Sequence, residues 1–295
     1  MRKGIFWIAS YPKSGNTWMR IFLENFLSDQ EEPVSINELS HVLTSCSRSM
    51  FDDTVGIESS DLTMDEIDLL RPLVYEHIAA KTDKRIFMKI HDAYSLNCNG
   101  KPLIPEKATA GVVYIIRNPL DVAVSYAGHF GCNYDTAVSR MSDPMNTLVR
   151  HDQYITHQFR QKLMSWSEHV MGWMESGLPL HVVRYEDMRQ DPLRTFEKVL
   201  TFLNLEYSLD KIKKAIDFSS FNALKHQEKS LGFKERPLTS ASFFRNGETG
   251  SWKTSLNSHQ IEKTVKDHRG IMFQLGYLDH CPPDYDGQHT VLANY

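Results

Sequence analysis

Four short, mostly apolar runs along the chain are each followed by polar residues. Each run is five or six residues long, and an apolar run of this length is typical of a strand buried inside a sheet. The predicted strands comprise residues 4–9, 85–90, 111–116 and 180–184.

Helical periodicity separates these runs. Trp18, Ile21, Phe22 and Phe26 recur at helical spacing and predict an amphipathic helix over about residues 17–27. The other predicted helices comprise most of 31–80, with Pro33 and Pro72 as breakers and a polar stretch near 45–60, then 119–130, 158–176, helices up to about 227, and 261–275, whereas 228–250 lacks periodicity and predicts a long loop.

Strands that alternate with helices predict an α/β fold with a parallel sheet. We therefore expect a single domain, residues 1–295, in which a central parallel sheet is flanked by helices. Ligands of such sheets bind beyond the carboxyl ends of the strands. Lys13, His91, Arg117 and Tyr185 all lie at or just after predicted strand ends, so the pattern predicts a ligand site at that edge.

The composition limits the class of protein. The chain has 295 residues, 41% of them hydrophobic, which is sufficient for one large core. Its 33 basic and 37 acidic residues give a net charge of −4, so we expect no nucleic acid partner, and a phosphate site would be local. The apolar run Ile5–Ala9 is too short for a signal peptide or a membrane span, and the four scattered cysteines form no CxxC pair. We therefore expect a cytoplasmic protein with no membrane partner, no zinc site and no disulfide framework.

The loop after the first predicted strand, residues 10–16, has the chemistry of an anion site. Free backbone N–H groups at a helix start bind oxyanions, Gly15 allows close approach of the backbone, and Lys13 adds a full charge. The loop differs from the phosphate loop of nucleoside triphosphatases, because its lysine precedes the glycine and no Gly-Lys-Ser/Thr sequence ends it. Asp92, after the second predicted strand, is only a weak candidate for a metal-binding acid. We expect a donor phosphate that is held without an obligatory metal ion.

Five short segments between residues 11 and 253 resemble those of one enzyme family. They are Tyr-Pro-Lys-Ser-Gly-Asn-Thr-Trp at 11–18, Met-Lys-Ile-His at 88–91, Tyr-Ile-Ile-Arg-Asn-Pro-Leu-Asp-Val-Ala-Val-Ser-Tyr at 114–126, Arg-Tyr-Glu-Asp-Met at 184–188 and Phe-Arg-Asn-Gly-Glu-Thr-Gly-Ser-Trp-Lys at 244–253. In this order they resemble the cytosolic-type sulfotransferases that use 3′-phosphoadenosine 5′-phosphosulfate (PAPS). The resemblance implies a P-loop-like (nucleoside-kinase-like) sulfotransferase fold. It also implies an enzyme that moves a sulfuryl group from PAPS to a hydroxyl or amine of a small-molecule acceptor, with 3′,5′-adenosine bisphosphate (PAP) as the second product.

The resemblance assigns roles to the residues that match the family segments. His91 would be the catalytic base, Lys13 would stabilise the leaving phosphate, and Lys89 would lie beside the reacting group. The donor would be held at its 5′-phosphosulfate by Lys13, Ser14, Gly15, Asn16 and Thr17, at its adenine by Trp18, Tyr185, Ser219 and Phe221, and at its 3′-phosphate by Arg117, Ser125, Arg245, Asn246 and Gly247.

The chain departs from the family pattern at a few positions. Asn246 stands where the family usually has lysine, which removes one charge near the 3′-phosphate. Asp92 follows His91 where many relatives have a small or apolar residue, and its carboxylate is expected either to raise the pKa of His91 or to orient its ring. The family's common dimer motif is absent after Trp252, so the oligomeric state stays open.

The acceptor pocket has no segment that resembles a specific relative. Its candidate residues are aromatic or lie in the polar stretch, and the loop over 228–250, which carries Arg245, is a candidate lid. The acceptor candidates are His129, Phe130, Tyr134, Phe243, Phe244 and residues 45–60.

Three other functions compete with this interpretation. A nucleotide kinase needs a magnesium site and the Gly-Lys-Ser/Thr loop ending, and the chain lacks the latter. A nucleotide-binding module without catalysis is disfavoured by Lys13 and His91. A carbohydrate sulfotransferase of the secretory pathway shares the donor segments, but we expect no membrane anchor here.

Overall fold

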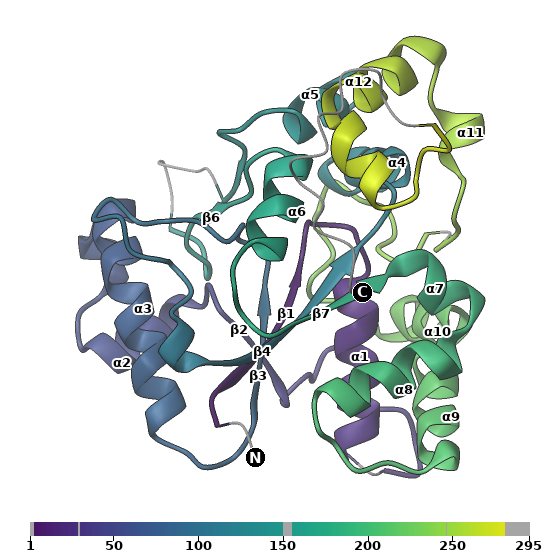
Figure 1. The fold of residues 1–295 in the computed structure, drawn as a ribbon. Helices are drawn as coiled ribbons and strands as arrows, with labels where there is room; N and C mark the ends of the chain where they lie inside the picture. Colours follow the sequence, from purple (N-terminus) through teal and green to yellow (C-terminus); the bar gives the residue numbers. More distant parts are fainter. Residues whose placement is uncertain (1–2, 29, 150–154, 246, 281–295) are drawn as a thin grey trace.

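The strands of the computed structural model form a five-stranded parallel sheet (Figure 1), and residues 3–28, 30–149, 155–245 and 247–280 are described. The strand order is β2-β3-β1-β4-β7. The sheet strands are β1 (Ile5–Ser10), β2 (Val42–Thr44), β3 (Ile86–Ile90), β4 (Thr109–Ile116) and β7 (Leu180–Arg184), and β5 (Thr147–Leu148) and β6 (Gln161–Lys162) form a separate antiparallel pair. The predicted α/β class and its four strands are confirmed, and the short strand β2 was not predicted.

The central strand β1 has all six residues buried because both of its faces are covered. Trp7 and Ala9 point into one hydrophobic cluster, and Phe6 and Ile8 point into another on the opposite face. This alternation explains why the strand is a continuous apolar run rather than an alternating one.

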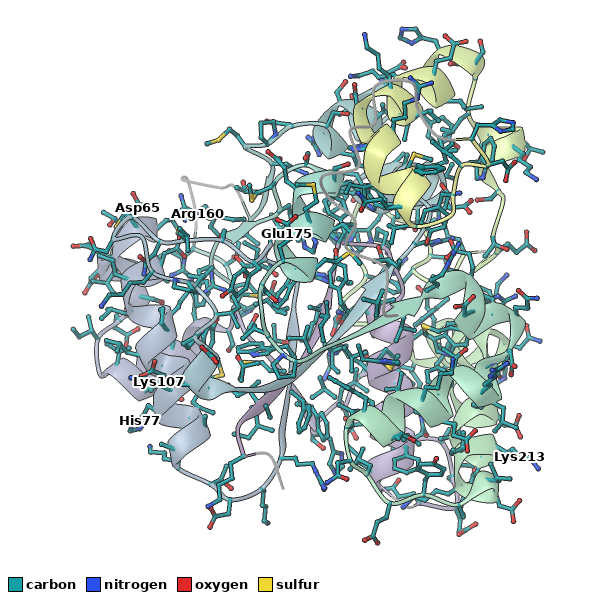
Figure 2. The ribbon with its side chains drawn as sticks, viewed as in Figure 1. Asp65, His77, Lys107, Arg160, Glu175 and Lys213 are labelled. Atoms are coloured by element: carbon teal, nitrogen blue, oxygen red, sulfur yellow. The ribbon has the colours of Figure 1, made fainter. Side chains whose placement is uncertain are left out.

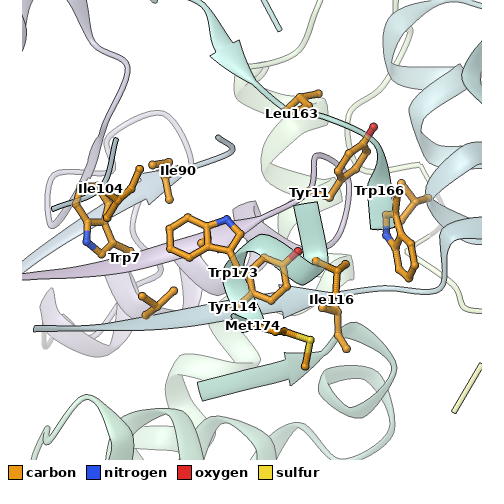
Figure 3. Packing of buried hydrophobic residues seen from close by; sticks show 14 of the residues in the cluster. Trp7, Tyr11, Ile90, Ile104, Tyr114, Ile116, Leu163, Trp166, Trp173 and Met174 are labelled. Carbon is orange, nitrogen blue, oxygen red and sulfur yellow. The ribbon is translucent and has the colours of Figure 1, made fainter. Parts of the chain in front are cut away.

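Two layers of helices bury the faces of the sheet. Figure 3 shows the cluster on the Trp7 face, where Tyr114 of β4 stacks on Trp173 with ring centroids 6.1 Å apart. Helices α2 (Arg48–Val55), α3 (Met64–Ala80), α4 (Pro119–Phe130), α6 (Trp166–Met174) and α12 (Ser258–Gln274) pack on this face, whereas α1 (Asn16–Ser28), α8 (Pro192–Phe202) and α9 (Leu209–Phe218) pack on the Phe6 face. The remaining α-helices are α5 (Tyr134–Met141), α7 (Tyr185–Gln190), α10 (Phe221–Leu231) and α11 (Trp252–Ser255).

Some predicted helices were wrong in extent. Residues 31–47 contain β2 and no helix, although 31–80 was predicted to be mainly helical. Pro72 does not break α3, which runs through it from Met64 to Ala80. Helix α6 begins at residue 166 rather than 158, because Ser165 caps it in a reciprocal box with Glu168.

Helix α10 continues to Leu231. The described residues between α10 and α11, 232–245 and 247–251, form the long predicted loop, which we call the late loop. Among the described residues, no helix is long and apolar enough to cross a bilayer.

The register of the sheet brings the carboxyl ends of its strands to one edge. Ala9 of β1 lies opposite Ile90 of β3, and Ile116 of β4 lies opposite Arg184 of β7. The residues that follow these strands therefore meet, as the sequence predicted.

Candidate active site

A cleft of about 630 Å³ lies at this edge of the sheet. Most of the predicted site residues line it, although they come from segments far apart in the chain. Those that do are Lys13, Gly15, Asn16, Thr17, Trp18, Lys89, His91, Arg117, Ser125, Tyr185, Ser219, Phe221, Arg245 and Gly247. Ser14 is fully buried behind the wall of the cleft, and Asn246 lies outside the described residues.

The loop between β1 and α1 requires glycine at residue 15. Gly15 has a φ of +111°, and a Cβ built there would lie 2.7 Å from the ring of Tyr185. Asn16 begins α1 and donates from its side-chain amide to the carbonyl of Ile8 at 2.8 Å. The Asn16 side chain therefore braces the loop against β1. Its backbone N–H belongs to the N-terminus of α1, where free N–H groups can bind an anion.

Arg117 has a polar atom that a bound anion can pair with. Its Nε is buried and has no hydrogen-bond partner within the described part of the chain, where Ser14 Oγ and eleven other buried side-chain atoms are also unpaired. Arg117 lines the cleft, so an anionic ligand there can accept from its guanidinium.

Lys13 lies where several cations converge. Its Nζ is 3.2 Å from Nδ1 of His129 and 4.0 Å from the centroid of the Phe243 ring. Burial, followed by the charges of Arg245, Arg117 and Lys89, lowers the pKa of Lys13 to about 7. Cations that disfavour one another in this way are stabilised by a polyanionic ligand.

Arg117 connects three parts of the site. Its guanidinium donates to the carbonyl of Lys13 at 3.1 Å and to the carbonyl of Glu248 at 2.8 Å. It also lies over the ring of Tyr185 at 4.2 Å, and the Tyr185 hydroxyl donates to the carbonyl of Gly247 at 2.7 Å. The first loop, the end of β4, the end of β7 and the late loop are thus tied together.

A second arginine, from the late loop, packs against helix α4. This helix begins at Pro119 with Asn118 as its N-cap. Arg245 of the late loop donates to the carbonyl of Val124 at 3.2 Å. Its guanidinium rests against Gly128, where a Cβ would come within 1.8 Å of Nη1. Ser125 lines the cleft from the same helix, so two arginines and a hydroxyl surround one end of it.

Several aromatic side chains line the neighbouring part of the cleft. Trp18 and Tyr185 meet edge to face, with ring centroids 5.9 Å apart. Phe221 packs against Gly247, where a Cβ would lie 2.5 Å from its ring. Ser219 is buried and donates its hydroxyl to the carbonyl of Ala215 at 2.7 Å, so it helps to end α9.

His91 is held in one tautomer by the end of β1. Its Nδ1 is 2.8 Å from the carbonyl oxygen of Ser10. A carbonyl only accepts, so Nδ1 carries the proton and Nε2 is the basic nitrogen. Burial, followed by the charge of Lys89, lowers the pKa of His91 well below its usual value. His91 is therefore a neutral base at pH 7.

Asp92 faces away from the cleft. Its carboxylate accepts from both terminal nitrogens of Arg71, at 3.2 and 2.6 Å, and from the backbone N–H of Lys162 at 2.9 Å. Both expected effects of Asp92 on His91 are wrong, because the carboxylate is engaged elsewhere and the pKa of His91 is lowered rather than raised.

The described residues contain no group of three or more His, Cys, Asp or Glu side chains that could hold a metal ion.

The Asp92 pair belongs to a larger ionic network that holds the segment before α6. Asp68 of α3 accepts from Arg160 and pairs with Lys162, both at 2.9 Å. Arg160 also reaches Asp65 at 3.0 Å on the surface, where Figure 2 labels both residues. These contacts hold the non-helical residues 160–162 against α3.

Glu235 was not predicted as a site residue from the sequence. This carboxylate of the late loop lies 3.4 Å from Nζ of Lys89 and 2.8 Å from Nη1 of Arg20 on α1. The loop has no periodicity that places its residues, and the three partners are separated by long stretches of chain. A run of charges at 234–236 was the only available signal.

Asp121, in the first turn of α4, was not predicted as a site residue. It accepts from the backbone N–H groups of Gly250 and Trp252 and from the hydroxyl of Ser251, at 2.7 to 3.2 Å. Asp121 therefore fixes the end of the late loop to α4.

Five of the named acceptor candidates line the cleft, namely His129, Phe130, Tyr134, Phe243 and Phe244. Residues 45–60 do not line this cleft, and several of them line a second groove instead. Glu235 lines both.

Comparison with known proteins identifies the family. Residues 4–272 match the sulfotransferase domain model. Sulfotransferase 2A6 of Mus musculus is 32% identical over 260 residues, which cover 86% of this chain and 79% of the relative. Flavonol 3-sulfotransferase of Flaveria bidentis is 26% identical, with 88% and 78% covered.

Solved structures agree in fold. Retinol dehydratase in complex with androsterone and the inactive cofactor PAP has a TM-score of 0.61 at 19% identity, covering 96% of this chain and 84% of that one. A mouse sulfotransferase complexed with PAP has a TM-score of 0.57 at 18% identity, covering 92% and 84%. Together with the domain match, these findings confirm the predicted fold and family: the chain belongs to the sulfotransferase family and is a PAPS-dependent sulfotransferase.

Proposed function

We propose that the enzyme transfers the sulfuryl group of PAPS to a hydroxyl or amine of a small-molecule acceptor, with His91 as the general base. The observation that supports this role is the hydrogen bond from Nδ1 of His91 to the carbonyl of Ser10, which leaves Nε2 basic inside the cleft. Lys13 and Lys89 line the same cleft and supply the positive charge that sulfuryl transfer needs.

The donor is proposed to lie across the loop between β1 and α1. Backbone N–H groups of this loop and the Lys13 ammonium would hold the 5′-phosphosulfate. Arg117, Ser125 and Arg245 would hold the 3′-phosphate, because an arginine fork suits a terminal phosphate. The adenine would lie among Trp18, Tyr185, Ser219 and Phe221.

In the proposed reaction, the acceptor oxygen or nitrogen attacks sulfur as its proton passes to Nε2 of His91. The bond between sulfur and the bridging oxygen breaks, and its electron pair stays on the 5′-phosphate of PAP. Lys13 stabilises the charge on that oxygen. Alignment of the three groups provides the remaining acceleration.

The acceptor side of the cleft favours a molecule with an apolar body. Its wall contains Phe130, Tyr134 and Phe243, and aromatic walls bind flat or apolar molecules. Structural neighbours of this fold were solved with androsterone and with retinol, each of which combines an apolar body with a hydroxyl.

The experiment that tests the function needs no knowledge of the acceptor. The purified protein is titrated with PAP in EDTA by calorimetry, with ADP and ATP, with and without magnesium, as comparators. Tight, metal-independent binding that prefers the 3′-phosphate supports the proposal and justifies an acceptor screen with PAPS. A preference for ATP with magnesium would instead favour a kinase.

The late loop is proposed to act as a lid over the donor. It forms one wall of the cleft and is pinned by Glu228, whose carboxylate accepts from the N–H groups of Phe243 and Phe244 at 2.6 and 2.9 Å. Limited proteolysis should cut this loop more slowly when PAP is bound, and equal cleavage with and without PAP would contradict a lid.

A further inference from the structure

The Glu235 carboxylate reaches the catalytic end of the cleft from the late loop. It accepts from Nη1 of Arg20 at 2.8 and 3.0 Å and from Nζ of Lys89 at 3.4 Å. The side chains of Arg20 and Lys89 are only 3% and 13% exposed. A buried ammonium is costly without a counter-ion, so this contact bears directly on the charge of Lys89.

Lys89 lies two residues before His91, so the two residues leave β3 on the same side of the strand. Both line the cleft. The charge of Lys89 therefore acts at the place where the proposed base works.

The charged and titratable groups around Lys89 come from every neighbouring segment. Burial and the charge of Arg20 disfavour the Lys89 ammonium, whereas Glu235 favours it. Glu235 is anionic, because Lys89 and Arg20 lower its pKa to about 2 against a partial desolvation that raises it, although its side chain is 35% exposed. The Cys46 thiol is neutral, because burial raises its pKa to about 12. Within the described residues, the groups whose charge is coupled to Lys89 include Arg20 on α1, Cys46 after β2, Lys13 in the first loop, His91 just after β3, His129 on α4 and Glu235.

We propose that Glu235 is a positioning residue for sulfuryl transfer, which holds the Lys89 ammonium in place and in its charged form beside the reacting group. Anchored by Arg20, the carboxylate couples the placement of the late loop to the charge at the catalytic end of the cleft. The inference rests on the proposed function, because it takes Lys89 to act on the sulfuryl group.

A matched control separates this role from simple anchoring of the loop. Glu228 pins the same loop through Ser242, Phe243 and Phe244, and it is absent from the cleft lining. Glu228→Gln should loosen the loop at residues 242–244 and leave Glu235 paired with Arg20 and Lys89, whereas Glu235→Gln removes the carboxylate charge beside Lys89.

The first measurement is independent of turnover. The purified wild-type, E235Q and E228Q proteins are acylated with trace acetic anhydride across a pH series, and the extent of Lys89 modification is read by mass spectrometry. The pH midpoint of Lys89 acylation should fall by about one pH unit or more in E235Q, because an adjacent opposite charge shifts a pKa by about 1 to 3 units. It should stay at the wild-type value in E228Q.

Two outcomes would overturn the inference. If the Lys89 midpoint is the same in E235Q and wild type, the carboxylate does not control the charge. If E228Q moves the midpoint as far as E235Q does, general loosening of the loop explains the effect. Glu235→Asp keeps the charge and should restore most of the wild-type midpoint.

Kinetics then test the catalytic consequence, with PAPS and an acceptor from the screen. E235Q should lower kcat about tenfold, the loss expected for one charge-assisted contact, and should leave PAP affinity within about twofold because PAP lacks the sulfuryl group. The alkaline limb of its rate profile should also move to lower pH. If kcat and the alkaline limb of the pH–rate profile are both unchanged in E235Q, the positioning role is refuted. Failure of the wild type to bind PAP would refute the proposed function itself.

Discussion

Replacement of Gly128 by alanine should remove Arg245 from its place on helix α4 and leave the fold intact. The added Cβ would lie 1.8 Å from Nη1 and 2.2 Å from Cζ of the guanidinium. No arginine can keep that position beside a methyl group. The guanidinium is the far end of a flexible side chain, so it can move into solvent without disturbing the backbone.

The magnitude follows from the lost contact. A hydrogen bond to a charged group contributes about 1.5 to 3 kcal/mol. Arg245 is exposed, so solvent screening places the expected loss at the lower end, about 1.5 kcal/mol. PAP should therefore bind about tenfold more weakly to G128A.

Stability should change in the opposite direction. Glycine inside a helix costs about 0.5 to 1 kcal/mol relative to alanine, so G128A should unfold at the same or a slightly higher urea concentration than wild type. Gly270 of α12 is the matched control, because a Cβ there meets no atom within 4 Å. G270A should gain a similar stability and keep its PAP affinity.

Calorimetry with PAP and with 5′-AMP decides the matter. If Arg245 reads the 3′-phosphate, G128A weakens PAP binding and leaves AMP binding unchanged. Equal PAP affinity in G128A and wild type would refute the role of Arg245 at this position. An equal loss for both nucleotides would show that the substitution acts on the adenine or the 5′ end instead.

Other predictions concern the remaining site and the core. His91→Ala should abolish PAPS turnover and retain PAP binding by calorimetry, and near-normal turnover would exclude His91 as the base. Because burial lowers the pKa of His91 well below its usual value, the rate of the wild-type enzyme should not fall on the acid side near about pH 6.5. Lys13→Ala should weaken PAP binding and slow turnover. Because the pKa of Lys13 is lowered to about 7, PAP binding to wild type above that pH should take up a proton, which calorimetry in buffers of different ionisation enthalpy would detect and which K13A should lack. Asp92→Ala should destabilise the fold by about 3 kcal/mol in urea unfolding, because it leaves Arg71 buried without its main counter-ion, whereas Asp65→Ala at the exposed end of the network should change stability by less than about 1 kcal/mol.

The part of the site built on strand ends could be predicted from sequence. Buried strands have a recognisable apolar run, and the order of strands and helices determines that their carboxyl ends meet. Lys13, His91, Arg117 and Tyr185 follow four such runs, so their convergence needed no knowledge of side-chain contacts.

The direction of a polar side chain could not be predicted in the same way. Asp92 adjoins His91 in the chain, yet its carboxylate points to Arg71 of α3. The direction of the carboxylate depends on the buried cation that α3 brings near the end of β3. The periodicity of the sequence contains no information on such a pairing. Asp92 was therefore interpreted as a neighbour that acts on the proposed base His91, although its carboxylate pairs with Arg71 in the core.

The late loop shows the same limit for whole segments. It has no periodicity because its residues are held by partners elsewhere: Glu235 by Arg20, Gly247 by Tyr185 and Glu248 by Arg117. In two of these three bonds the loop contributes a backbone carbonyl, which any residue carries, so the sequence leaves no trace of the contact. The proposed donor and catalytic ends of the cleft nevertheless share this wall. A substitution in the loop is therefore expected to alter donor affinity and turnover together when it moves the backbone, and to alter only one of them when it removes a single side chain such as Glu235.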